Sequence, residues 1–145
     1  MIPTERTQKL ASIPLQEVSD YRDWLRTCFQ EELAERLAVR EGGSFYEDEN
    51  IYHCALLLHL VSDLDDLPSL YSAKFYSAKC SGDMDLGCGF DWQFLFMCEP
   101  ETLKESAKSI GRGDIVQRAE AYEEDYRNKD MEAWLNGVIR YYRRA

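Results

Sequence analysis

The stretch Asn50-Ile-Tyr-His-Cys-Ala-Leu-Leu-Leu-His-Leu-Val61 is apolar around nearly its whole helical circumference. A surface helix of a soluble protein keeps one polar face, so a helix without such a face is expected at the centre of the molecule. The apolar run is also too short to cross a bilayer. We therefore predict a central buried helix over about residues 50–61, and we expect His59 to be a core histidine rather than a ligand or a base.

On both sides of this stretch, apolar side chains recur at steps of three and four, which is typical of amphipathic helices. Turn and capping residues punctuate these patterns, among them Gly42-Gly43, Pro68, Pro100 and Gly111. Asp63, Asp65 and Asp66 are expected to cap the helix that follows them, and Asp114 and Asp130 the last two. The predicted helices span approximately residues 15–40, 67–79, 100–110, 115–126 and 131–142, besides the central one.

Little β-type alternation is present, so the pattern predicts an all-α fold. We expect a single compact multi-helix domain of six to seven helices over residues 1–145, with residues 1–12 only loosely ordered. One small hairpin has room at 43–46 or within 81–90. A hydrophobic content of 45% over 145 residues is sufficient for such a core. Because the first residues lack a basic segment followed by an apolar run, a cytoplasmic location is expected.

Five cysteines are present, an odd number at irregular intervals, which favours reduced thiols used as small hydrophobes over a disulfide framework. The alternative is a metal site built from Cys80, Cys88 and Cys98. The chain has no Cys-x-x-Cys pair and no histidine at a usual ligand spacing from these residues. We therefore predict no metal and no cofactor.

The negative charge of the chain is concentrated in residues 41–100. This segment holds eleven carboxylates and two lysines, so it carries −9 of the formal net charge of −10. A localised acidic surface favours a basic partner, which it attracts over a distance. The alternative is that these carboxylates form only a solvated face. The residues expected to bind the partner are Glu47, Asp48, Glu49, Asp63, Asp65, Asp66, Asp83 and Asp85.

Other chemistry is weakly represented. A small hydrolase or metal-dependent enzyme with a site near the 81–91 loop would need His59, Asp63 and Asp91 to converge in one pocket. Asp83-x-Asp85 resembles the start of a calcium loop, but Phe94 stands where that loop needs a glutamate. Direct binding of nucleic acid is not expected, because the chain clusters basic residues only at its C-terminus. The protein is therefore not predicted to be an enzyme.

Residues 87–119 carry a resemblance to a known family. Gly89-Phe-Asp-Trp-Gln-Phe-Leu-Phe96, followed by Leu103, Ala107, Ile110-Gly111 and the run Ile115 to Ala119, resembles a segment and helix junction of the DMP19-like proteins, small acidic helical proteins that include a DNA mimic. The family's Asn-Gly-Gly is Gly87-Cys88-Gly89 here. The resemblance implies an α-helical fold, inhibition of a protein by an acidic surface, a core position for Phe90, Phe94 and Phe96, and a Gln93 side chain bonded to loop backbone.

The leading hypothesis is a non-enzymatic acidic binding protein that inhibits or neutralises a basic protein partner. That partner would be a toxin or a nucleic-acid-binding protein. This chain would act on it as an immunity or antitoxin-type protein or as a DNA mimic. No membrane partner is expected. A third hypothesis is self-association, for example as a homodimer, because the pattern does not guarantee burial of Trp24, Trp92 and Trp134.

Overall fold

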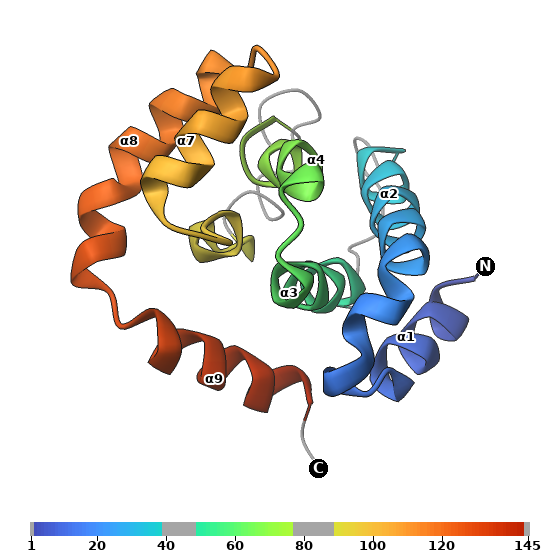
Figure 1. The fold of residues 1–145 in the computed structure, drawn as a ribbon. Coiled ribbons are helices and arrows are strands. Elements are labelled where there is room, and N and C mark those ends of the chain that lie inside the picture. Colours follow the sequence, from blue (N-terminus) through green and yellow to red (C-terminus); the bar gives the residue numbers. More distant parts are fainter. Residues whose placement is uncertain (1, 39–48, 77–88, 144–145) are drawn as a thin grey trace.

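The computed structural model describes residues 2–38, 49–76 and 89–143, and every regular element within these ranges is helical. Seven of these elements are α-helices, which confirms the predicted all-α class and the predicted six to seven helices. In chain order they are α1 (Pro3–Ser12), α2 (Arg22–Ala38), α3 (Asn50–Val61), α4 (Leu67–Tyr71), α7 (Pro100–Ser109), α8 (Gly113–Asn128) and α9 (Met131–Tyr142) (Figure 1). Shorter helical turns are η1 (Leu15–Tyr21), η2 (Leu64–Asp66), η3 (Ser72–Tyr76) and η4 (Trp92–Leu95).

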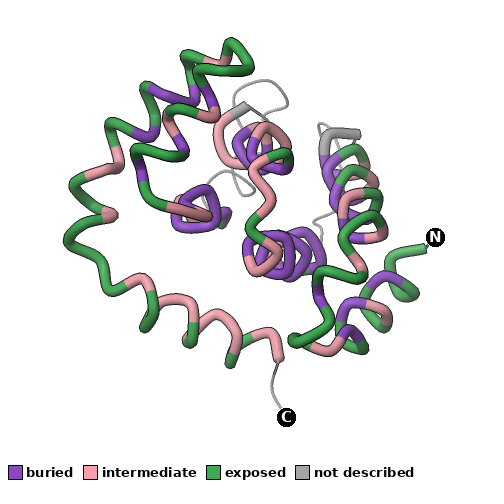
Figure 2. Tube along the Cα trace, in the orientation of Figure 1, coloured by how far each residue is buried: buried purple, intermediate pink, exposed green. Residues whose placement is uncertain are grey.

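Helix α3 lies at the centre of the molecule, as predicted (Figure 1). It contacts α1, α2, α9, η1 and η4. Nine of its twelve residues are buried, and Figure 2 shows this burial along most of the helix. The side chain of His59 is 8% exposed, so its expected core position is confirmed. The apolar circumference of this sequence is therefore matched by neighbours on every side.

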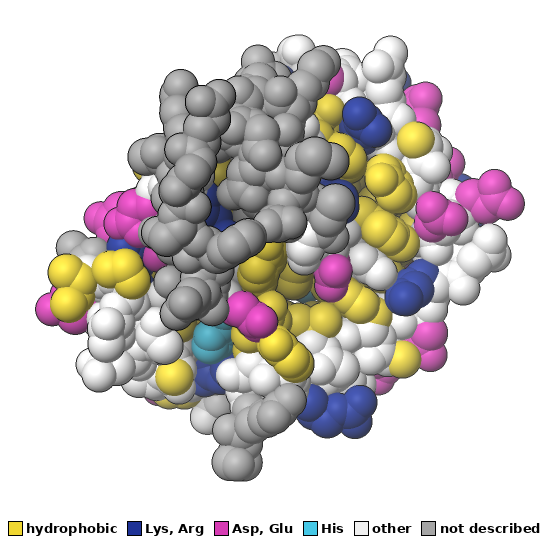
Figure 3. All heavy atoms as spheres, turned by 180° about the vertical axis from the view of Figure 1, so that it is seen from behind, with side chains coloured by type: hydrophobic (Ala, Val, Ile, Leu, Met, Phe, Trp, Pro, Cys, Tyr) yellow, Lys and Arg dark blue, Asp and Glu magenta, His cyan; other side chains and the backbone are white. Residues whose placement is uncertain are grey.

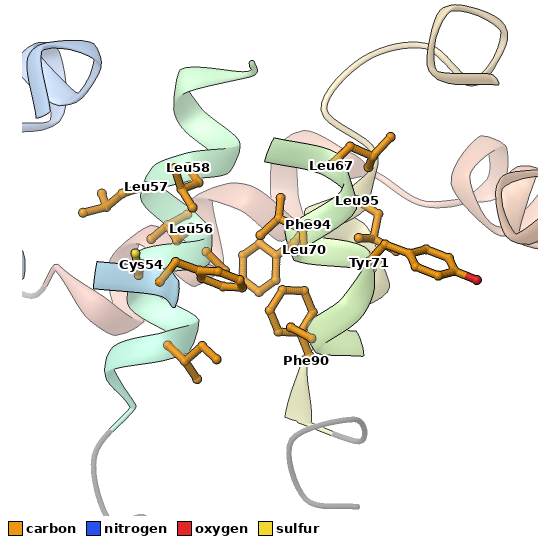
Figure 4. Packing of buried hydrophobic residues seen from close by; sticks show 14 of the residues in the cluster. Cys54, Leu56, Leu57, Leu58, Leu67, Leu70, Tyr71, Phe90, Phe94 and Leu95 are labelled. Atoms are coloured by element: carbon orange, nitrogen blue, oxygen red, sulfur yellow. The ribbon is translucent and has the colours of Figure 1, made fainter. Parts of the chain in front are cut away.

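The rings of Phe90 and Phe94 lie between α3 and α4 (Figure 4). Phe90 and Phe94 are buried, and their rings meet at a T-shaped angle with centroids 5.3 Å apart. Phe90 also meets the ring of Phe29 from α2. Edge-to-face pairs of this kind add about 0.5–1.5 kcal/mol beyond the burial of the rings. Phe96 is buried as well, which agrees with the core positions expected for the three phenylalanines. Gln93 is also buried, but its side chain does not form the expected hydrogen bond with the described backbone.

Helices α7 and α8 form a pair that lies side by side (Figure 1). The turn between them places Gly111 at φ +72°, in the left-handed region that glycine adopts without a steric penalty. Leu103 and Ala107 of α7 and Ile115 of α8 are buried in the same core. From the end of α8, helix α9 runs back beneath α3 toward α1, and none of its residues is fully buried (Figure 2).

Three predicted segments have a different secondary structure in the folded chain. Residues 1–12 were expected to be loosely ordered, but Pro3–Ser12 forms α1, whose Arg6 and Leu10 are buried. The predicted helix over 15–40 is instead the 3₁₀ segment η1 followed by α2. The predicted helix from residue 67 is α4 followed by the π-helical turn η3, and its last three residues lie outside the described ranges.

The capping predictions hold for Asp130 and Asp63 and fail for Asp66 and Asp114. Asp63 is the N-cap of η2, the 3₁₀ turn that leads into α4, and its Oδ1 accepts a hydrogen bond from the backbone N–H of Asp65 at 2.9 Å. Asp130 caps α9, because its Oδ1 accepts a hydrogen bond from the backbone N–H of Ala133 at 3.0 Å. Asp66 stands at the N-cap of α4 without a capping bond, since its carboxylate pairs with an arginine of α2. Asp114 lies inside the first turn of α8 and binds Arg112, which occupies the N-cap position.

Three cysteines lie within the described ranges, and each is a free thiol. Cys28 and Cys54 are buried, as expected for small hydrophobes, while Cys98 is half-buried. Burial and the neighbouring Cys28 raise the pKa of the Cys54 thiol well above its ordinary value, which keeps it protonated. Cys80 and Cys88, the other two residues of the alternative metal site, lie outside the described ranges, as do the hairpin candidates at 43–46 and 81–88. None of the described helices has the length and apolar character needed to cross a membrane.

Candidate functional site

The eight carboxylates predicted to bind a partner divide into two groups. Four of them fall outside the described residues: Glu47, Asp48, Asp83 and Asp85. The other four lie at opposite ends of α3, with Glu49 immediately before the helix and Asp63, Asp65 and Asp66 just after it. Glu49 and Asp65 are exposed to solvent. The described carboxylates therefore do not form one continuous run along α3.

Asp63 and Asp66 are paired with two arginines of α2. The Asp63 carboxylate lies 2.8 Å from Arg22 and 2.9 Å from Arg26, and Asp66 lies 2.5 Å from the Nε of Arg26. A hydrogen bond from the backbone N–H of Asp65, together with these arginines, lowers the pKa of Asp63. Burial raises the pKa of Asp66 in spite of Arg26, because a carboxylate loses hydration there. These two acids hold the α2–α4 junction together, and their charge is balanced within the chain.

The three residues required by the enzyme hypothesis do not contact one another. His59 is buried, with Nδ1 3.2 Å from the carbonyl oxygen of Phe94, and burial lowers its pKa. Asp63 belongs to the arginine pairs, and Asp91 binds the indole of Trp134. Trp134 also packs edge-on against the His59 ring, so the ring system separates the histidine from Asp91. The described residues therefore offer no acid–base pair built from these three groups.

A groove lies between α9 and the segment that precedes η4. We call it the α9 groove; its volume is about 390 Å³. Four aromatic residues line it, together with small residues of α9 and a single carboxylate. The full lining is Gly89, Asp91, Phe94, Ala133, Trp134, Gly137, Val138, Tyr141 and Tyr142. On this side of the molecule hydrophobic and acidic side chains lie next to one another around a hollow (Figure 3).

Two carboxylates are held at the α9 groove by its own aromatic residues. The indole Nε1–H of Trp134 donates to Oδ2 of Asp91 at 3.1 Å, and the hydroxyl of Tyr141 donates to Oε1 of Glu49 at 2.9 Å. The pKa of Tyr142 is raised, first by burial and then by the charges of Glu49, Tyr141 and Asp91. The groove is thus aromatic and electronegative at once.

The C-terminal end of α9 is anchored to the core by two contacts. The ring of Tyr142 stacks on His53 of α3, with centroids 5.3 Å apart and an interplanar angle of 16°. The guanidinium of Arg143 donates to the backbone carbonyls of Leu10 at 2.8 Å and of Ile13. Because Asp130 caps the other end, α9 is fixed at both ends while its middle spans the groove.

Metal binding finds no support within the described ranges. No three histidine, cysteine or carboxylate side chains come together there in a way that could hold an ion. The calcium-loop candidates Asp83 and Asp85 lie outside those ranges. Asp91, which follows the calcium-loop candidates in sequence, accepts a hydrogen bond from the indole N–H of Trp134.

Comparison with known proteins gives no match. No protein-family model matches the chain, and neither a curated protein nor a solved structure is significantly similar to it.

The α9 groove was not predicted from the sequence. The apolar side chains of α9 are only partly covered by the rest of the chain. Two features of the sequence are consistent with a groove: Gly137 in the middle of a helix, and the adjacent tyrosines Tyr141 and Tyr142. A glycine there leaves a gap in the helix surface, because a Cβ built on Gly137 meets no atom within 4 Å.

Proposed function

We propose that this chain is a non-enzymatic binding protein that inhibits or neutralises a basic protein partner. The observation that carries the proposal is the α9 groove, where Glu49 and Asp91 stand beside the rings of Trp134, Tyr141 and Tyr142. Aromatic side chains next to charged groups are typical of the residues that dominate binding energy at protein interfaces. The net charge of −10 supports the same class of partner.

The binding surface proposed here is narrower than the acidic face inferred from the sequence. Asp63 and Asp66 are neutralised by Arg22 and Arg26, so they contribute little to the field that a partner meets. Glu49 keeps its place in the proposed surface, and Asp91 joins it. Whether the partner is a toxin or a nucleic-acid-binding protein depends on chemistry outside this groove, and the immunity-type and DNA-mimic readings both follow from the same surface.

Capture from the host's lysate at low salt tests this function. The immobilised chain should retain a basic protein that elutes within a moderate salt gradient, because exposed charge pairs are screened by salt. Glu49→Lys should shift elution to clearly lower salt. The matched control is Glu120→Lys, which makes the same charge change at an exposed position of α8 and should elute with the unmodified chain. Failure to retain any basic protein, or an equal effect of both substitutions, would contradict the proposal.

A further inference from the structure

We propose that the α9 groove receives an arginine side chain of the basic partner. This inference rests on the proposed function and states the chemistry of the group that enters the site. The groove of about 390 Å³ is larger than a single side chain, so an arginine could enter with part of the backbone that carries it.

The charges at the α9 groove match a guanidinium group. Glu49 and Asp91 each use one oxygen to accept a bond from a ring of the groove. Among the described residues no donor contacts their second oxygens, so within this part of the chain each carboxylate offers one further acceptor. A guanidinium carries five N–H donors in a planar fork and can therefore reach two acceptors at once, whereas an ammonium acts as a compact point charge.

The aromatic lining selects arginine over lysine. Entry into a groove lined by Trp134, Tyr141 and Tyr142 requires a cation to lose part of its hydration, and a guanidinium is more weakly hydrated than an ammonium. Its flat faces also stack on aromatic rings, an interaction of about 0.5–2 kcal/mol depending on exposure. One face of the Tyr142 ring is already covered by His53, which holds that ring in place before the ligand arrives.

Arg143, a cation adjacent to the groove in sequence, does not compete for the site. Arg143 follows Tyr142 directly, but its guanidinium is hydrogen-bonded to the carbonyls of Leu10 and Ile13 on the side of α1. Asp91 is the one charged residue in the described lining of the groove. The charge carried by this lining is therefore negative.

The test is an NMR titration of the full-length chain with three blocked tripeptides, acetyl-Gly-Arg-Gly-amide and its Lys and Gln counterparts. The probes are the indole N–H signal of Trp134, assigned with Trp134→Phe, and the backbone amide of Gly137. The arginine peptide should shift both signals in a saturable manner with a Kd on the order of 1 mM, as expected for one anchoring side chain. The glutamine peptide should leave them unchanged.

Gly137→Leu supplies the site-directed arm of the experiment. A Cβ at this position meets no atom within 4 Å, so the leucine side chain should occupy the groove without disturbing the core, and binding should weaken at least tenfold. The matched control is Gly113→Leu, which makes the same change at another glycine with open space, in the first turn of α8 and away from the groove. That variant should bind the arginine peptide as the unmodified chain does.

Three results would overturn the arginine assignment: no response to the arginine peptide, an equal response to the lysine peptide, or unchanged binding by a folded Gly137→Leu variant. Each can occur while the chain still captures a basic protein in a manner sensitive to Glu49→Lys. In that case the proposed function stands and the partner is held by surface charge rather than by an arginine in the groove. If capture also fails, the proposed function fails with it.

Discussion

His53 is a buried histidine that also supports the α9 groove. Its side chain is 8% exposed, stacks on Tyr142 and has Nε2 3.5 Å from Nη1 of Arg143. Burial, with a smaller contribution from the positive charge of Arg143, lowers the pKa of His53 to about 4. The folded protein therefore holds this ring in its neutral form.

Stability should fall as the pH decreases from 7.5 to 5.0. Because the pKa of His53 is lower in the folded state than in the unfolded state, the unfolded chain binds the proton first, and stability rises with pH in this window. The loss expected from His53 alone is about 2 kcal/mol between these two pH values. Urea unfolding at both pH values, with His53→Phe as the non-titrating variant, measures it. The same pH dependence in the variant and the unmodified chain would rule out this role for His53.

Arg6 and Glu32 form an ion pair that is entirely removed from solvent. Nη1 of Arg6 lies 2.9 Å from Oε2 of Glu32, and both side chains are 0% exposed; Glu35 binds the same guanidinium from the next turn of α2. Arg6→Met should cost about 3–5 kcal/mol in the free energy of unfolding, because Glu32 loses the buried guanidinium that pairs with it. The double variant Arg6→Met/Glu32→Leu should recover most of that loss. Chemical unfolding of both variants tests this, and a double variant no more stable than the single one would contradict it.

At the level of elements, α9 combines partial packing against the core with a capped first turn. None of its residues is fully buried, and Asp130 accepts the capping bond from the N–H of Ala133. Asp130→Ala should destabilise the helix by about 1 kcal/mol, whereas Asp130→Asn should retain the cap. Hydrogen exchange of the α9 amides measures the difference. Equal protection in the two variants would show that packing alone fixes this helix.

The helices that could be predicted from the sequence are those whose own residues specify them. Residues 50–61 carry an apolar surface that requires a central position, and Pro100 and Gly111 delimit α7 by backbone geometry. Helix α1 was missed because it is short and polar and is held by contacts with distant residues, such as the Arg6 pair with α2. The same reason explains Asp66. Its carboxylate binds Arg26, forty positions away in sequence, instead of capping α4.

At the scale of the whole molecule, the composition predicted an acidic surface but not its distribution. A count of carboxylates cannot tell which of them meet arginines: Asp63 and Asp66 are neutralised by α2, whereas Glu49 forms no ion pair with the described residues. The α9 groove was beyond prediction for a related reason. It is assembled from Asp91 and residues of α9 more than forty positions later, and only tertiary structure brings them together.

The free protein and its complex should respond to salt in opposite directions. A net charge of −10 on one small domain destabilises the compact state by self-repulsion, which salt screens over a Debye length of about 10 Å at 0.1 M. The short ion pairs of Asp63 and Asp66 with α2 are partly buried and are screened less. Raising NaCl from 20 to 500 mM at pH 7.5 should therefore stabilise the free chain by about 1 kcal/mol, or roughly 3 °C in Tm. The same change should weaken a complex held by charge.

Thermal unfolding measures the effect of salt on the free chain. Repeating it near pH 4.7, the isoelectric point, provides the control, because the effect should vanish where the net charge does. A Tm that falls with salt at pH 7.5 would mean that local ion pairs, and not the overall charge, dominate the electrostatics of the fold.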